Sequence, residues 1–140
     1  MPNVGDTMFP HCYVCGQQNA RGLQVPFAPH PGGGCRAEYV AREEHVGWPE
    51  VIHGGLLFTL MDEAVAWAVI CAGLHGVTAR AEAKFRAPVR VGATLVVRGW
   101  LVGPPRRVTR ARAELREGTE DGPLIAELDA LMAISRDGRP

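Results

Sequence analysis

The sequence predicts an α+β fold in which an antiparallel β-sheet wraps around one long central helix. Residues 56–72 indicate the helix, because Thr59, Asp62 and Glu63 are the only polar side chains in that run. A helix that is apolar on every side is normally buried. Short segments on either side of the run alternate apolar and polar residues, which is typical of strands. Short connections between such strands favour antiparallel pairing.

The segments before the helix are short. Residues 1–10 are expected to form a loose, flexible leader. Residues 23–27 and 35–39 alternate in polarity and predict two strands, separated by a turn at 28–34 that is rich in glycine and proline. Residues 42–49 then form a loop that leads into the helix.

Four further strands follow the helix, at residues 79–86, 94–102, 108–115 and 126–134. Tight turns join them, so we expect an antiparallel meander. In the first of the four, alternation assigns one face to small or apolar residues that would lie against the helix. These residues are Ala79, Ala81, Ala83 and Phe85.

The chain is expected to form one domain. No repeat or linker divides it, so the domain spans residues 11–135 and residues 136–140 form a tail. Pro49 lies before the central helix and Gly73 after it. These breakers predict a helix that begins near Gly54 and stops near Ala72.

Composition excludes several classes of function. The formal net charge of the 140 residues is zero, so no global field attracts nucleic acid or an anionic membrane. The first ten residues lack the pattern of a signal peptide. The apolar run of 17 residues carries two carboxylates and is short for a membrane span. A cytoplasmic protein with four reduced cysteines is therefore expected.

Cys12 and Cys15 form a Cys-x-x-Cys pair, which invites a zinc interpretation. Structural zinc requires four ligands, and His11 and Cys35 are the candidates for the third and fourth. Because the sequence has no second closely spaced pair, we expect a packed turn with two buried thiols and no metal. The zinc alternative stays open at this point.

The start of the helix and the acid within it suggest a reaction at a carbonyl group. His53 precedes Gly54 and Gly55, where the first backbone N–H groups have no partner inside the helix. These groups and the helix dipole would stabilise negative charge developing on a carbonyl oxygen. Asp62 could then act as a general base on water or as a nucleophile.

Helix geometry predicts that two subunits share this chemistry. Gly54 and Asp62 are eight residues apart, which corresponds to roughly 12 Å along a helix axis. One helix therefore cannot direct both groups at the same carbonyl. A two-fold dimer with antiparallel helices can, if Gly54 comes from one subunit and Asp62 from the other.

Three motifs resemble a known family. They are HGGLLFTLMDEA at residues 53–64, the Gly-Trp-Pro at 47–49 and FRAPVRVG at 85–92. Together they are similar to the hotdog-fold acyl-CoA thioesterases of the phenylacetate-degradation type, which are related to 4-hydroxybenzoyl-CoA thioesterases. The Cys-x-x-Cys-Gly segment at 12–16, followed by Asn19, Gly22 and Leu23, resembles a leader found in many members. The resemblance covers about residues 11–134.

The resemblance implies roles for individual residues. Asp62 would be the catalytic carboxylate, the Gly54 N–H would polarise the thioester carbonyl, and His53 would be the adjacent motif histidine. Thr78 falls where relatives often have a Ser or Thr that helps to position water or the acid. Gly47 is a departure, because some relatives have an Asn or Gln there that contacts the water or the substrate.

The resemblance also implies an acyl-CoA substrate, no cofactor, and a homodimer or a dimer of dimers. Gly55 shares the helix start with Gly54, and Trp48 either lines an acyl pocket or covers the dimer edge. Arg106 and Arg107 lie at a predicted turn and are candidates for contacts with the phosphates of coenzyme A.

Other polar residues have structural explanations. Glu63 points about 100° away from Asp62 on a helix, so we expect it to pair with an arginine. Arg110 and Arg112 suit cross-strand pairing with Glu127 and Asp129. Four histidines are expected at the surface or in loops: His11, His30, His45 and His75.

Three rival functions remain beside thioester hydrolysis. A hotdog protein that binds acyl-CoA without turnover is favoured by Gly47. A hydratase or dehydratase on the same fold would use other motifs, which this sequence lacks. A zinc-stabilised interaction module would require metal at Cys12 and Cys15.

Overall fold

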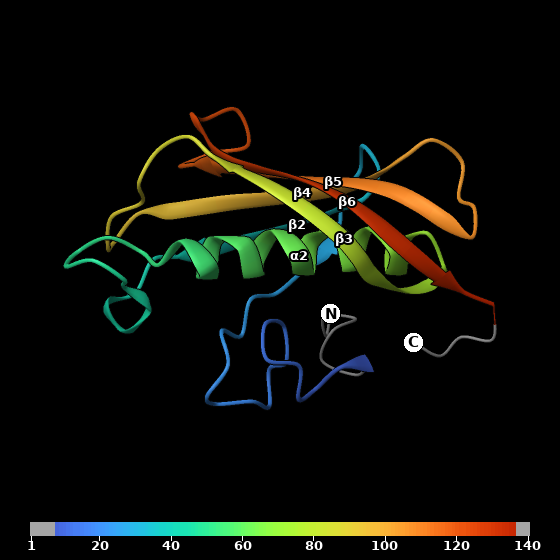
Figure 1. The fold of residues 1–140 in the computed structure, drawn as a ribbon. Coiled ribbons are helices and arrows are strands. Elements are labelled where there is room, and N and C mark those ends of the chain that lie inside the picture. Colours follow the sequence, from blue (N-terminus) through green and yellow to red (C-terminus); the bar gives the residue numbers. More distant parts are fainter. Residues whose placement is uncertain (1–7, 137–140) are drawn as a thin grey trace.

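The computed structural model describes residues 8–136, in which a six-stranded antiparallel sheet packs against one long helix (Figure 1). The predicted α+β architecture is confirmed. Most of the predicted leader and tail lies outside the described residues. The elements are β1 (Ala28–Pro29), β2 (Cys35–Val40), the 3-10 helix η1 (Glu43–His45), α2 (Gly54–Cys71), β3 (His75–Phe85), β4 (Thr94–Val102), β5 (Val108–Glu117) and β6 (Leu124–Ser135).

Both ends of α2 agree with the prediction. The helix begins at Gly54, directly after the N-cap residue His53. It ends at Cys71, and Gly73 follows with a φ of 77°. Glycine adopts this left-handed conformation without strain. The backbone N–H of Leu74 then donates to the carbonyl of Val69 at 3.2 Å, which satisfies a carbonyl of the last turn.

Strand order corrects the predicted meander. The sheet runs β1-β2-β4-β5-β6-β3, so of the four strands after the helix only β4, β5 and β6 follow one another as neighbours. Strand β3 lies beside β6 at the far edge, and the chain crosses the sheet before it enters β4. The crossing segment is fixed near the start of α2, where Val51 bridges to Arg90 and the N–H of Ile52 donates to the carbonyl of Val89.

The predicted strand at residues 23–27 is wrong. These residues are extended, but they pair with the turn before them: the N–H of Leu23 donates to the carbonyl of Tyr13, and that of Val25 to the carbonyl of Val14. Their alternation arises because Leu23, Val25 and Phe27 are buried. Figure 1 shows this N-terminal segment on the side of α2 opposite the sheet.

Strand β3 contains a bulge that the sequence pattern did not predict. Thr78 pairs with Met132 and Arg80 pairs with Leu131, so Ala79 has no opposite residue in β6. Ala79 is exposed, whereas Ala81 is half-buried, so the prediction that they share one face is wrong. An extra residue in one strand shifts the alternation of its side chains by one position. Residues before the bulge therefore face the opposite way from the one that regular alternation with the later residues predicts. Thr78 therefore faces the helix together with Ala81.

Close contact between helix and sheet depends on Gly99 in β4. A Cβ atom at Gly99 would lie 2.3 Å from the carbonyl oxygen of Ala64 in α2. Glycine thus allows the helix backbone to approach the strand directly. The largest side chains buried in the core are Trp67, Phe27, Leu60, Met61, Leu95, Leu115, Leu128 and Met132.

By length and composition alone, α2 could cross a membrane, with 18 residues and a mean hydropathy of 1.5. The sequence-based judgement that the run is too short for a span is therefore not supported by length. Within the fold, eight of its side chains are buried against the sheet and the N-terminal segment. Its apolar character is explained by this packing, since core helices meet the same criterion.

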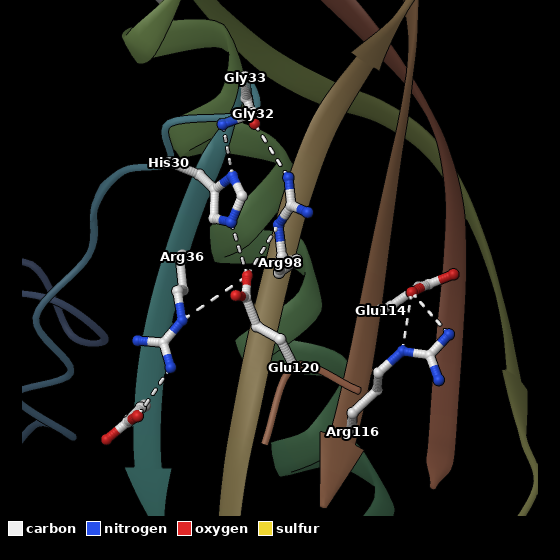
Figure 2. A network of polar contacts seen from close by, with 9 residues as sticks. His30, Gly32, Gly33, Arg36, Arg98, Glu114, Arg116 and Glu120 are labelled. Carbon is white, nitrogen blue, oxygen red and sulfur yellow. Dashed lines mark hydrogen bonds and ion pairs between the residues drawn. The ribbon is translucent and has the colours of Figure 1, made fainter. Parts of the chain in front are cut away.

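The outer face of the sheet carries a charged cluster around Glu120 (Figure 2). His30 Nε2 lies 2.7 Å from Glu120 Oε1, and the Nε atoms of Arg36 and Arg98 lie 3.7 and 3.6 Å from the same oxygen. Arg98 also donates to the carbonyl of Gly33 at 3.0 Å. The cluster joins the 30–34 turn, β2, β4 and the β5–β6 turn. His30 lies in a loop, as expected, and is a half-buried partner of Glu120.

The expected cross-strand pairs are found on β5 and β6, with one change of partner. Arg110 pairs with Asp129 at 2.7 Å, and Arg112 lies 3.7 Å from the same carboxylate. Glu127 pairs with Arg86 at 3.0 Å instead. These arginines thus have partners within the sheet.

Candidate functional site

The start of α2 is organised by the His53 side chain. His53 Nδ1 accepts a hydrogen bond from the backbone N–H of Gly55 at 2.9 Å. This bond caps the helix and satisfies one of its free donors. In the neutral imidazole, an accepting Nδ1 leaves the proton on Nε2, so the outer edge of the ring presents an N–H donor.

Gly54 keeps a free amide at the same helix end. Among residues 8–136, no acceptor is found for its backbone N–H. It borders an open cavity of about 470 Å³, which is lined by Gly47, Trp48, Ile52, His53 and Gly54. A Cβ atom built on Gly54 would meet nothing within 4 Å. Of the two glycine amides proposed from the sequence, Gly54 is therefore the available donor and Gly55 is already occupied.

The loop before the helix holds His53 in place. The N–H of His53 donates to the carbonyl of His45 at 2.9 Å. The ring of His45 is itself fixed, because its Nδ1 lies 2.7 Å from the Tyr39 hydroxyl and its Nε2 lies 3.4 Å from an Arg42 guanidinium nitrogen. Burial lowers the pKa of His45, and the charge of Arg42 lowers it further. His45 is thus part of the support for the site and not a simple surface residue.

Gly47 packs directly against the histidine ring. A Cβ atom at Gly47 would lie 3.1 Å from His53 Cδ2. A larger residue there requires the His53 ring to shift. Some relatives have an Asn or Gln side chain at this position. Here the loop backbone at Gly47 packs closely against the His53 ring instead.

Asp62 lies two turns further along α2 and is half-buried. The hydroxyl of Thr78 donates to Asp62 Oδ1 at 2.8 Å, across the helix–sheet boundary. The same hydroxyl lies 3.6 Å from the sulfur of Met132. The bulge at Ala79 directs Thr78 inward, so the structure brings together the two residues that the family resemblance paired.

Asp62 and Gly54 are not brought together within one chain. Asp62 does not line the cavity at Gly54. The eight-residue separation places the two groups roughly 12 Å apart along the helix axis. A single chain therefore does not direct both groups at one carbonyl.

The remaining predicted substrate contacts are solvent-facing. Trp48 is 81% exposed beside the helix start. Arg106 and Arg107 are exposed in the turn between β4 and β5. They do not line the Gly54 cavity. The preceding Pro105 instead lines a cavity of about 590 Å³ near Cys71, at the opposite end of α2.

Glu63 has a different partner from the one expected. Its Oε1 accepts from Cys12 Sγ at 3.3 Å, and no arginine pairs with it in the described part of the chain. Cys12, Cys15 and Glu63 form a cluster of ligand-type side chains. His11 and Cys35, the ligands considered from the sequence, are not part of it. Sequence spacing could not pair Glu63 with Cys12, which lies 51 positions earlier.

Solved structures with the same fold are numerous. One is the crystal structure of a thioesterase superfamily protein, with a TM-score of 0.79 and 24% identity, covering 87% of this chain. This chain spans 62% of the length of that protein. Another is a hypothetical thioesterase from Streptococcus pneumoniae with coenzyme A, with a TM-score of 0.72 and 20% identity, covering 79% of this chain and 85% of that one.

Structures of mutants of the Streptococcus protein are also similar, one with an aspartate and one with a threonine replaced by alanine, and these two positions are sixteen residues apart. A mutant of the phenylacetic acid degradation protein PaaI from Thermus thermophilus matches with a TM-score of 0.69 and 25% identity. It covers 79% of this chain and 92% of that one. No curated protein matches by sequence.

A family model decides the assignment. The model of the thioesterase superfamily matches residues 50–123, which is 74 of the 140 residues. The match includes α2 with both glycines of its first turn, Asp62 and Thr78. The resemblance to hotdog thioesterases is thereby confirmed: the chain belongs to the thioesterase superfamily and has its hotdog fold.

Proposed function

We propose that this protein hydrolyses an acyl-CoA thioester in a homodimer, with Asp62 of one subunit and the Gly54 N–H of the other acting on one carbonyl. One observation carries the proposal: α2 bears two suitable groups. The Gly54 amide at its positive end has no acceptor among the described residues, and the Asp62 carboxylate is oriented by a hydrogen bond from the Thr78 hydroxyl. The membership of the thioesterase superfamily supports the reaction type.

The reaction follows from these groups. The carbonyl oxygen of the thioester accepts a hydrogen bond from the Gly54 N–H. The helix dipole stabilises the negative charge that develops on this oxygen. Asp62 removes a proton from a water that attacks the carbonyl carbon, or attacks that carbon itself. The C–S bond breaks, and the CoA sulfur leaves as a thiolate that takes up a proton. Where Asp62 is the nucleophile, water then hydrolyses the mixed anhydride and restores the carboxylate. One water is consumed, giving the free acid and CoA thiol.

Thr78 and His53 are assigned supporting roles. The Thr78 hydroxyl occupies Asp62 Oδ1 and leaves Oδ2 to face the water. The Nε2–H of His53 is directed away from the capped amide and is available to the substrate. The two mutated positions of the Streptococcus protein fit this assignment, because Asp62 and Thr78 are also sixteen residues apart.

The substrate would lie at the subunit boundary. Trp48 is highly exposed in the single chain and borders the Gly54 cavity, so it is proposed to contact the acyl group or the second subunit. Arg106 and Arg107 are proposed to contact CoA phosphates. Replacing either by Ala would then raise KM for acyl-CoA, with Arg21→Ala as the control. An unchanged KM in both would remove them from the site.

The function is tested by hydrolysis of a panel of acyl-CoAs with detection of the released thiol. Short-chain, long-chain and aromatic acyl groups are each assayed with the wild type and with Asp62→Asn. The account requires turnover of at least one substrate and its loss in the variant. Equal activity of the two proteins would disprove the role of Asp62.

A second candidate is an acyl-CoA-binding protein without turnover. It is favoured by Gly47, which supplies no side chain to hold a water where some relatives have Asn or Gln. The same panel separates the two, because this candidate predicts saturable binding by calorimetry and no thiol release. Thiol release at any substrate excludes it.

A further inference from the structure

Three metal-ligand side chains, from the N-terminal segment and from α2, form a cluster. Figure 1 shows the N-terminal segment on the side of α2 opposite the sheet. Cys12 and Cys15 come from the turn that follows Phe9, and Glu63 comes from the middle of the helix. The two sulfurs and a carboxylate oxygen all lie within 4.8 Å of one another. Cys12 Sγ and Glu63 Oε1 are already 3.3 Å apart.

The turn that carries the cysteines is shaped to hold both sulfurs on one side. The N–H of Cys15 donates to Cys12 Sγ at 3.4 Å, and the N–H of Gly16 donates to the carbonyl of Cys12 at 2.9 Å. A Cβ atom at Gly16 would lie 2.5 Å from the backbone N of Cys12 and 2.6 Å from the carbonyl oxygen of Pro10. Only glycine fits this tight turn. A backbone donor to sulfur is strengthened when the sulfur is a thiolate.

A buried donor also faces the second cysteine. Trp67 is 1% exposed, and its Nε1–H has no hydrogen-bond partner in the described part of the chain. Its ring is fixed by stacking on Phe27, at 6.1 Å between centroids. The indole N–H lies near the Cys15 side chain, where it is available to donate to the sulfur.

The cluster has no cation of its own. Within residues 8–136, no lysine, arginine or histidine lies within ion-pair distance of Glu63. A half-buried carboxylate between two thiols, without a positive partner, is an unfavourable arrangement unless something else compensates it.

We propose that Cys12, Cys15 and Glu63 bind a zinc-class divalent cation, with a water at the fourth position. Two thiolates favour zinc over magnesium or calcium. With Zn–S bonds near 2.3 Å, two tetrahedral sulfur ligands lie about 3.8 Å apart. The three ligand atoms already lie within 4.8 Å of one another, so only small shifts are needed to bind one cation. Two thiol protons leave to solvent as the cation binds.

The cation would fasten the N-terminal segment to the helix. Glu63 is adjacent to Asp62 in the sequence, so this bond fixes α2 directly beside the carboxylate of the candidate site. The backbone of the segment is already paired internally, as in the bonds from Leu23 to Tyr13 and from Val25 to Val14. The cation adds a link between this unit and α2. The inference does not depend on the proposed hydrolysis.

The test is a cobalt titration of the reduced, metal-stripped full-length protein. We expect one equivalent of Co²⁺ to bind and to give a sulfur-to-cobalt charge-transfer band in the near ultraviolet. One equivalent of Zn²⁺ should then abolish the band. Cys12→Ser and Cys15→Ser should each remove or halve the band, and Glu63→Gln should weaken binding by about 10-fold or more. Cys71→Ala, a cysteine on the same helix outside the cluster, is the control and should bind as the wild type does.

Two results would overturn the proposal. One is the absence of the band in wild-type protein with all four thiols shown to be reduced. The other is an unchanged band in both Cys12→Ser and Cys15→Ser. Circular dichroism of each variant checks that it is folded, and the wild-type titration decides the question even where a serine variant fails to fold.

Discussion

The Thr78 hydroxyl donates to Asp62 Oδ1 at 2.8 Å and so links strand β3 to the middle of the central helix. The bulge at Ala79 makes this contact possible, because regular alternation would place Thr78 on the same face as Arg80, away from the helix. The bulge therefore has a chemical consequence: Asp62 Oδ1 is held by the Thr78 hydroxyl, whereas Oδ2 has no hydrogen-bond partner among residues 8–136.

Removing the hydroxyl should impair the chemical step more than substrate binding. A hydrogen bond to a charged group contributes about 1.5–3 kcal/mol, so Thr78→Val is expected to lower kcat by roughly 10-fold or more. Thr78→Ser keeps the donor and should retain most of the activity. Steady-state kinetics on the best substrate of the panel measures both. A Val variant with unchanged kcat would show that the contact is only structural.

His53 has two separable functions, capping the helix and presenting Nε2–H. His53→Ala removes the cap and should lower the free energy of unfolding by about 1 kcal/mol. His53→Asn supplies an oxygen acceptor for the Gly55 N–H and should restore most of that stability. If Nε2–H contacts the substrate, the Asn variant stays slow despite its stability. Urea denaturation and kinetics on the same three proteins decide this, and full activity of His53→Asn would rule out the contact.

Stability should depend on pH through His45. Burial and the charge of Arg42 lower the pKa of this histidine from its ordinary value of 6.5. Between the lowered native value and 6.5, the unfolded chain binds more protons than the folded one. His45 therefore stabilises the fold fully above about pH 6.5, and this contribution is lost as the pH falls towards the native pKa.

An NMR titration of the His45 ring tests this directly. The native pKa should lie below 6.5, and the free energy of unfolding should depend less on pH in His45→Gln, over a range from about pH 7.5 to about pH 5. A native value above the ordinary one would contradict the burial argument.

Gly99 should tolerate no side chain. A Cβ atom would lie 2.3 Å from the backbone oxygen of Ala64, which cannot move without displacing α2. Gly99→Ala is therefore expected to lower the free energy of unfolding by about 2 kcal/mol. Gly54→Ala is a suitable control for stability, since its Cβ meets nothing within 4 Å and the position is helical. Equal stabilities of the two variants would show that helix and sheet separate easily.

The sequence predicted the parts of the fold that depend on local pattern. The helix at Gly54–Cys71 and strand β4 at Thr94–Val102 agree closely with expectation, because periodicity and flanking breakers specify them. Residues 23–27 were wrongly predicted to be a strand. An extended segment that is buried on one side shows the same apolar–polar alternation as a strand paired in a sheet. The position of β3 beside β6 depends on long-range pairing, which alternation does not encode.

The candidate site shows the same division. Asp62, Gly54 and His53 could be found from the sequence because they lie in one continuous motif. The inward direction of Thr78 came from the family resemblance and not from alternation, because a bulge leaves no clear mark in the residue pattern. The occupation of the Gly55 amide by His53, and the contact of Glu63 with Cys12, depend on side-chain geometry that spacing alone does not reveal.

The central claim, that each site takes Asp62 from one subunit and the Gly54 amide from the other, can be tested with mixed dimers. Asp62→Asn removes the acid. Gly54→Pro removes the N–H, and proline is well tolerated at the first position of a helix. His53 already has φ −59° and ψ 130°, a conformation compatible with a following proline.

The decisive measurement is the thioesterase activity of the heterodimer of Asp62→Asn and Gly54→Pro, purified after co-expression with two different tags. Each homodimer should be inactive. In the heterodimer one site carries both mutations and the other carries neither, so activity should return to about half of the wild-type value per dimer. A heterodimer as inactive as its parents, while wild-type dimers carrying the same tags remain active, would contradict the shared site.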